Sequence, residues 1–122
     1  MDERTLTEGE ADVMEALWAL GRGSVREVNS HLPELAYTSI GTWLKILEGK
    51  GFVRSTADGR RLLYEPTLTR QEYLGRSVNK LTSRWFGGNR LGVLRQLVEG
   101  GLSEAELAEL RRLIDEKIGS KR

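Results

Sequence analysis

Apolar residues recur every three or four positions along most of this chain, the spacing that places them on one face of an α-helix. In the first half of the chain this pattern predicts helices at about 8–20, 24–32 and 38–49. Gly21 and Pro33 end the first two, because glycine favours a helix C-terminus and proline cannot continue a helix. The sequence therefore predicts three short helices before any strand.

Four expected helix starts carry a Ser or Thr followed three residues later by Glu. In such a pair the hydroxyl accepts a hydrogen bond from the helix, and the carboxylate accepts one from the capping residue. The pairs are Thr7/Glu10, Ser24/Glu27, Thr69/Glu72 and Ser103/Glu106. Because the apolar spacing marks the same starts independently, these pairs strengthen the helix predictions.

A β-hairpin is predicted directly after the third helix. Runs at 52–56 and 61–65 flank Asp58-Gly59, and Asp-Gly in this setting favours a type I′ turn with both residues at its centre. Arg60 and Arg61 follow the turn. Helices followed by an arginine-tipped hairpin are typical of a winged helix-turn-helix, an architecture that binds duplex DNA more often than it does anything else.

The exposed face expected for the third helix is small and polar. Thr38, Thr42 and Lys45 lie opposite its apolar arc, and side chains of this kind let a helix lie close to base edges in the major groove. A solvated helix face and solubilising charges on an edge hairpin are the plainer interpretations of the same pattern. The candidate DNA contacts are Arg26, Tyr37, Thr38, Ser39, Thr42, Lys45, Arg54, Arg60 and Arg61.

The sequence after Pro66 has helical spacing and no strand pattern. Glycine pairs at 87–88 and 100–101 divide it into three amphipathic pieces with too little core to stand alone. We therefore expect a mainly α fold with a small β-hairpin wing, in which residues 1–66 form a winged helix-turn-helix DNA-binding domain and residues 67–122 a helical dimerisation region. The side chains expected at the dimer interface are Leu74, Val78, Leu81, Trp85, Phe86, Leu94, Leu107, Leu110 and Ile114.

Composition and charge restrict the function further. The chain is 39% hydrophobic and 30% charged, and it has no membrane-length apolar run and no signal-peptide pattern, so we expect a cytoplasmic protein without membrane insertion. The net charge is only +1, but residues 36–64 hold five Lys and Arg against two acidic residues. Residues 1–67 as a whole hold 8 against 11. The positive charge is therefore local to the predicted helix and hairpin, where phosphates would be met.

Catalysis and cofactor binding find no support in the sequence. There is no nucleophile-and-base pattern and no glycine loop that could hold a phosphate. A chain with no cysteine and one histidine offers few ligands for a transition metal. We expect no enzymatic activity, no cofactor and no metal site.

In their order and spacing these segments resemble the BlaI/MecI/CopY family of bacterial repressors, which includes the penicillinase repressors. The resemblance runs nearly end to end. The motifs that carry it are Leu6-Thr7-x-x-Glu10-x-x-Val13-Met14-x-x-Leu17-Trp18, Val25-Arg26-Glu27-Val28, Tyr37-Thr38-Ser39-Ile40-x-Thr42-x-Leu44-x-x-Leu47-x-x-Lys50-Gly51-Phe52-Val53, Gly59-Arg60, Tyr64-x-Pro66, Phe86-Gly87-Gly88 and Leu102-Ser103-x-x-Glu106-x-x-x-Leu110.

The resemblance implies a homodimer whose winged-helix domains bind a double-stranded DNA operator with dyad symmetry and whose C-terminal helices hold the two chains together. In the penicillinase branch it also implies a membrane-bound sensor protease, whose signal leads to cleavage in the C-terminal part and release of the operator. The Asn-Phe pair cut in that branch falls at Gln96-Leu97, the candidate cleavage site here. The cysteine-rich tail of copper-responsive members is absent, which argues against direct copper sensing.

Two functions follow from the sequence. The first is a dimeric transcriptional repressor, with proteolysis as the candidate means of relief. The second is a winged-helix protein-interaction module without specific DNA binding, which Gly41 and the acidic excess of residues 1–67 favour. Trp43 and Ile46 also depart from the family's recognition helix. Salt dependence discriminates between the two functions, because a DNA binder loses affinity steeply as salt rises.

Overall fold

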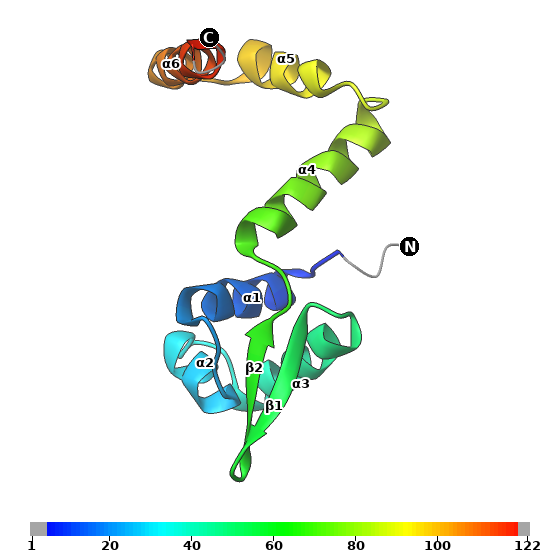
Figure 1. Ribbon diagram of the computed structural model, residues 1–122, viewed down its shortest axis with the longest axis vertical. Coiled ribbons are helices and arrows are strands. Elements are labelled where there is room, and N and C mark those ends of the chain that lie inside the picture. Colours follow the sequence, from blue (N-terminus) through cyan, green and yellow to red (C-terminus); the bar gives the residue numbers. More distant parts are fainter. Residues whose placement is uncertain (1–4, 120–122) are drawn as a thin grey trace. The chain divides into compact units, whose positions relative to one another are not determined.

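Six α-helices and one antiparallel hairpin form the part of the chain, residues 5–119, that the computed structural model describes (Figure 1). The elements in chain order are α1 (Glu8–Leu20), α2 (Val25–His31), α3 (Tyr37–Gly49), β1 (Val53–Asp58), β2 (Arg61–Pro66), α4 (Arg70–Trp85), α5 (Arg90–Gly100) and α6 (Glu104–Gly119). The mainly helical fold class and the hairpin after the third helix confirm the prediction. The predicted ranges 1–66 and 67–122 begin and end outside the described residues.

The four predicted capping boxes are all present, at the starts of α1, α2, α4 and α6. At α1 the backbone N–H of Thr7 donates to Glu10 Oε1 at 2.9 Å, and the N–H of Glu10 donates to Thr7 Oγ1 at 3.4 Å. Each box satisfies two amides that the helix itself cannot pair, so the local sequence determines where these helices begin.

The core of the first part forms where α1, α2 and α3 meet the hairpin. Phe52, Val53 and Tyr64 close the core from the hairpin side. The fully buried side chains on the helices are Val13, Met14, Leu17, Val28, Ile40, Leu44 and Leu47. The three members from α3 are the apolar arc that the spacing predicts. Burial of each large apolar side chain contributes about 1.5–3 kcal/mol, so this arc fixes which face of α3 points outward.

The hairpin turn differs from the predicted one. Asp58 pairs with Arg61, so the central residues of the turn are Gly59 and Arg60 rather than Asp58 and Gly59. Gly59 has a φ of +66°, and none of the described non-glycine residues has a positive φ. A type I′ turn needs positive φ at both central positions, whereas type II′ needs it only at the first. The prediction of a type I′ turn was therefore wrong: Asp58 remains in the strand, where its carboxylate contacts Arg61.

The loop between α1 and α2 is tied to the base of the hairpin. The backbone N–H groups of Gly23 and Tyr64 each donate to the other residue's carbonyl, at 2.9 and 2.8 Å. Beyond the last strand pair, the N–H of Thr67 donates to the Phe52 carbonyl at 2.9 Å, and the Thr67 hydroxyl donates to the Gly51 carbonyl at 2.6 Å. These bonds fix the hairpin against the start of α2 and the end of α3.

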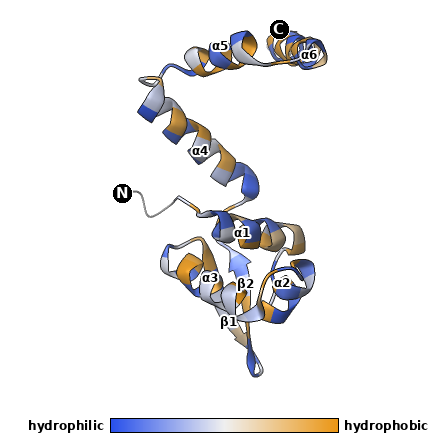
Figure 2. Cartoon of the chain, turned by 180° about the vertical axis from the view of Figure 1, so that it is seen from behind, coloured by the Kyte–Doolittle hydropathy of each residue, from blue (hydrophilic) through white to orange (hydrophobic). Residues whose placement is uncertain are grey.

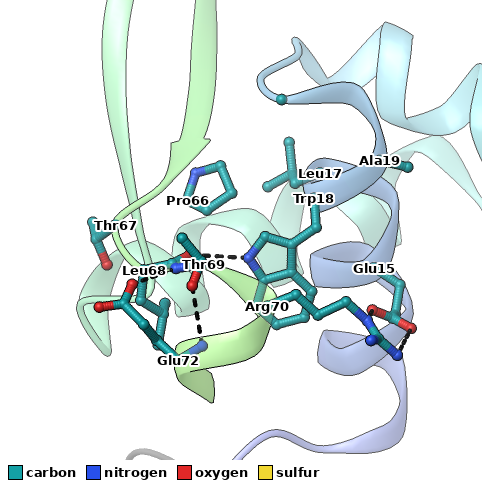
Figure 3. Close-up of a pocket in the computed structure, with 11 residues that line it drawn as sticks. Glu15, Leu17, Trp18, Ala19, Pro66, Thr67, Leu68, Thr69, Arg70 and Glu72 are labelled. Carbon is teal, nitrogen blue, oxygen red and sulfur yellow. Dashed lines mark hydrogen bonds and ion pairs between the residues drawn. The ribbon is translucent and has the colours of Figure 1, made fainter. Parts of the chain in front are cut away.

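The segment that follows the hairpin packs on α1 (Figure 3). Leu68 is buried and accepts a hydrogen bond from Trp18 through its carbonyl, and Arg70 donates to Glu15 at 2.7 and 3.3 Å. The ring of Tyr73 lies 5.8 Å from that of Trp18. A pocket of about 720 Å³ lies between α1 and residues 66–72.

The contacts divide the chain into two units, Met1–Leu74 and Gly75–Arg122. The predicted boundary at Pro66 comes earlier, because Leu68 and Tyr73 pack on the core of the first unit. The first turn of α4 therefore belongs to the first unit by its contacts, although the helix itself continues into the second.

The second unit buries very little. Among its described residues Thr82 is buried, and α5 and α6 have no buried residue at all. The turn from α4 to α5 is nevertheless well defined, because Gly87 and Gly88 have φ of +57° and +84° and the Thr82 carbonyl accepts the N–H groups of Phe86 and Gly88. Hydrophobic and hydrophilic residues alternate along α4, α5 and α6 (Figure 2). No helix in the described part of the chain is long and apolar enough to cross a membrane.

Candidate nucleic-acid interface

The turn between α2 and α3 is held by the side chain of Asn29. Its amide nitrogen donates to the carbonyl of Leu35 at 2.8 Å and, more weakly, to that of Leu32 at 3.4 Å. Leu32 caps α2, and Pro33 prevents the helix from continuing. The sequence alone does not single out Asn29, because an isolated asparagine near a helix end has no distinctive spacing. Its effect is to fix the direction in which α3 leaves the turn.

α3 presents the small polar face that the sequence predicts. Thr38, Thr42 and Lys45 are exposed, and the Thr42 hydroxyl donates to the Thr38 carbonyl at 3.1 Å. The Thr42 oxygen therefore remains available as an acceptor. Together with Ser39 and Trp43, the two threonines line a shallow hollow of about 230 Å³ on this face. The side chains of Thr38, Ser39 and Thr42 on this face are small and allow close approach to another surface.

Two polar contacts hold the C-terminal end of α3. The carboxylate of Glu48 accepts hydrogen bonds from the N–H and the hydroxyl of Ser55, at 3.2 and 2.6 Å, which joins α3 to β1. Lys50 donates to Glu10 at 2.8 Å and to the Thr5 carbonyl at 3.2 Å, which joins α3 to the start of α1. Helix α3 is thus held by polar bonds as well as by its apolar arc.

Glu10 is the buried member of this second contact, with 3% of its surface exposed. Burial alone raises the pKa of its carboxyl, but the hydrogen bond from Lys50, the N–H of Thr7 and the positive charge of Lys50 outweigh it. The net result is a pKa below the ordinary value of 4.5. Glu10 therefore stays ionised and serves both as half of the capping box and as the counter-ion of Lys50.

Trp43 is accommodated by a glycine on α1. A Cβ atom added to Gly9 would lie 2.4 Å from the nearest atom of the Trp43 ring, so no other residue fits at position 9 without displacing that ring. Trp43 is half-buried as a result. This pairing explains how α3 carries a bulky aromatic residue on the side that faces α1. The sequence carries no spacing signal for it, because Gly9 and Trp43 lie far apart in the chain.

α3 also differs from the other helices at its N-terminus. Side chains cap α1, α2, α4, α5 and α6, whereas Ala36 precedes α3 without any side-chain hydrogen bond to its first turn. The first amides of a helix are unpaired within it and favour anions. In this chain they lie beside Tyr37 and Thr38, on the face described above.

The three wing arginines differ in their contacts. Arg54 donates to Glu65, its cross-strand partner, at 2.9 Å. Arg61 contacts Asp58 at 3.2 Å and Glu27 of α2 at 3.6 Å. Arg60, at the tip of the turn, forms no ion pair with any described residue. Lys45 and Arg26 are likewise exposed and unpaired within the described chain.

The residues predicted for the dimer interface lie on α4, α5, α6 and the turn after α4. Phe86 and Leu110 are half-buried within the single chain, and the others are exposed, up to 70% for Trp85. The candidate cleavage pair, Gln96 and Leu97, lies inside α5. Each of these side chains belongs to the second unit or, in the case of Leu74, to the edge of the first.

Comparison with known proteins identifies the family. The model of the penicillinase repressor family matches residues 6–116. The chain belongs to this family. It is a family of transcriptional repressors, which confirms the resemblance seen in the motifs and supports DNA as a partner.

Solved structures agree with this family. The DNA-binding domain of the repressor BlaI is 25% identical, with a TM-score of 0.50, and the match covers 57% of this chain and 88% of that one. MarR from E. coli is 18% identical, with a TM-score of 0.53, over 93% of this chain and 76% of its own. YusO from Bacillus subtilis is 17% identical, with a TM-score of 0.56, over 98% and 79%. At such identities MarR and YusO support the winged-helix fold alone.

One relative in sequence is an uncharacterised 16.5 kDa protein encoded in the ptsI 3′ region of Latilactobacillus sakei. It is 27% identical over 116 residues, which span 92% of this chain and 80% of that protein. The match therefore extends through both units of this chain.

Proposed function

We propose that this repressor is a homodimer that binds a dyad operator, with α3 in the major groove and the hairpin against the flanking backbone. The observation that carries the proposal is the exposed face of α3. Ile40, Leu44 and Leu47 are fully buried, so the helix has one fixed orientation. The opposite face has Thr42 and Lys45, which are short or flexible and can reach base edges or phosphates.

The proposed contacts fall into two classes. Thr42 and Lys45 lie where a helix in the groove meets bases, whereas Arg26 on α2 and Arg60 on the turn lie where the backbone passes. Tyr37, Thr38 and Ser39 surround the uncapped start of α3, which suits a phosphate. This arrangement separates positioning by phosphate contacts from sequence selection by base contacts.

Dimerisation is supported by the apolar side chains that the second unit leaves exposed. Leu91 is 71% exposed and Leu97 is 50% exposed, and the helix that carries them buries nothing within the single chain. Surfaces of this kind on a soluble domain mark association sites. A second copy would bury them and would place two reading helices on the two halves of a dyad site, which increases affinity because the second half binds intramolecularly.

Proteolysis would act on the same unit. A cut between Gln96 and Leu97 would interrupt α5 and separate α6 from the rest of the chain. Because a protease binds an extended segment, α5 would have to open locally before cleavage. We propose that such a cut relieves repression by weakening the dimer rather than by altering α3.

The proposed function is tested with operator fragments that the purified protein selects from genomic DNA. The double variant Thr42→Ala with Lys45→Ala should keep the fold, because both side chains are exposed, and should lose about 1–3 kcal/mol of operator binding if either reads a base or is well paired. Arg111→Ala, which removes one exposed cation from α6, is the control. Unchanged affinity in a folded double variant would show that α3 is not the reading helix.

The rival function, a protein-interaction module, predicts a different result in the simplest binding assay. Parent protein that binds DNA must lose affinity for random duplex steeply as salt rises, by a slope of about 0.9 for each phosphate contacted. Weak binding with a flat salt dependence would favour the rival. The acidic excess of residues 1–67 makes this measurement necessary.

A further inference from the structure

We infer that the two arginines at the wing tip have different roles: Arg60 supplies the phosphate contact, and Arg61 is a positioning residue that joins the wing to α2 through Glu27 and Asp58. This inference rests on the proposed function, since it assigns the two arginines separate roles in DNA binding by the wing. Adjacent arginines in a sequence are easily treated as equivalent, but these two form different contacts in the fold.

Arg61 already has two anionic partners. Its guanidinium nitrogens lie 3.2 and 3.3 Å from one oxygen of Asp58, and a third nitrogen lies 3.6 Å from Glu27 Oε1. If Arg61 moved to a phosphate, it would leave two carboxylates uncompensated beside the DNA. Because like charges repel across such a distance, this exchange opposes binding rather than assisting it.

The partner on α2 is itself held in place. Glu27 Oε1 also accepts the N–H of Ser24 at 2.9 Å, as part of the box that begins α2. That hydrogen bond, together with the positive charges of Arg61 and Arg22, lowers the pKa of Glu27, so the carboxylate is ionised at neutral pH. The contact therefore joins the wing to a fixed point at the start of the helix-turn-helix.

Backbone hydrogen bonds also join the wing to the residues just before α2. Gly23 precedes the capping residue and pairs with Tyr64 of β2 through two hydrogen bonds. The wing is thus attached to the start of α2 at its base by backbone and nearer its tip by Arg61. A planar guanidinium can span two carboxylates, whereas an ammonium group is a point charge that cannot reproduce this geometry.

Arg60, unlike Arg61, has no anionic partner among the described residues. It is the second central residue of the turn, next to Gly59 with its φ of +66°, and it forms no ion pair with the described residues. A phosphate needs only a positive charge within reach, which either an arginine or a lysine provides. The charge free to meet DNA at the tip is therefore that of Arg60.

Four full-length variants, compared over the same series of salt concentrations, separate the two roles: Arg60→Ala, Arg60→Lys, Arg61→Ala and Arg61→Lys. Binding to random-sequence duplex of about 30 base pairs is measured as a function of salt, because the slope counts the phosphates contacted. Arg60→Ala should reduce the slope by about 0.9 for each phosphate that the protein no longer neutralises, and Arg60→Lys should restore it. Arg61→Lys should bind as weakly as Arg61→Ala, with the parental slope in both.

The amide resonances of the free protein provide a second measurement. Arg61→Ala should shift the Ser24 amide, which shares Glu27 as its acceptor, whereas Arg60→Ala should leave it in place. The inference is overturned if Arg61→Lys binds like the parent, if Arg61→Ala lowers the slope as Arg60→Ala does, or if neither Arg61 variant changes binding. A parent protein with no salt-dependent binding would instead contradict the proposed function itself.

Discussion

The indole nitrogen of Trp18 donates a hydrogen bond to the backbone carbonyl of Leu68, 3.0 Å away. This bond joins the end of α1 to the segment that connects the hairpin with α4. Leu68 is buried beneath it, and Tyr73 packs its ring against both Trp18 and Phe52 at 5.8 Å. The start of α4 is therefore part of the core that positions α3.

Trp18→Phe tests the contribution of this bond. Phenylalanine keeps an aromatic ring beside Tyr73 but removes the donor, which leaves the Leu68 carbonyl unpaired. We expect the free energy of unfolding, measured by urea denaturation, to fall by about 1–2 kcal/mol. Tyr37→Phe is the control, because it removes a polar donor from an aromatic side chain that is 55% exposed in the same unit. An equal effect of both changes would mean that the Trp18 bond has no special role.

Acid should weaken the first unit through Glu10. Its pKa is lower in the folded chain than its ordinary value of 4.5, so the folded state is favoured above that value and loses this contribution as the pH falls through the lowered pKa. Unfolding free energies measured between about pH 3 and pH 6 should therefore fall toward the acid end. Glu10→Gln should be less stable at neutral pH, because Lys50 loses its partner, and should show a flatter acid decline. Glu8→Gln, an exposed carboxylate in the same turn, is the control.

The parts of this fold that could be predicted from the sequence are those that depend on residues close together in the chain. The boxes at Thr7 and Ser24 place their helices correctly, because capping depends on residues three apart. The turn at Gly59 was misplaced by one residue, because the dipeptide pattern cannot detect that Asp58 pairs with Arg61. The register of the two strands places Asp58 opposite Arg61, where Arg61 also contacts Glu27 of α2.

Contacts between distant residues account for what the sequence could not provide at the site. Gly9 accommodates Trp43 across two helices, and Asn29 holds a turn through its side-chain amide. Neither has a periodic or motif signal. The exposed face of α3 was predictable, by contrast, because it is the complement of an apolar arc that helical spacing defines.

Gly41 offers a test that separates binding from stability. It lies inside α3 without positive φ, and a Cβ added there would meet nothing within 4 Å. Gly41→Ala should therefore raise the free energy of unfolding by about 0.5–1 kcal/mol, because glycine is unfavourable in a helix interior. If this edge of α3 approaches DNA closely, the added methyl should weaken operator binding in the same variant.

Gly75→Ala is the matched control for that change. Gly75 is also helical and open at its Cβ position, but it lies on α4. It should gain similar stability and keep parental operator affinity. Gly41→Ala with unchanged affinity would place the DNA elsewhere on α3.

Assembly is tested by a charge on α4. Leu81 is 45% exposed in the single chain and shares a helix face with Val78 and Trp85, so a partner would bury it. Leu81→Asp should place a carboxylate in that interface, and an unpaired buried charge costs several kcal/mol, enough to dissociate a dimer at micromolar concentration. Ser83→Asp adds the same charge at an exposed position on the opposite face and should leave assembly unchanged. Sedimentation of the parent and both variants measures the outcome directly. If the parent sediments as a monomer at tens of micromolar, the dimer model fails, and repression would have to depend on a single winged helix bound to one half-site.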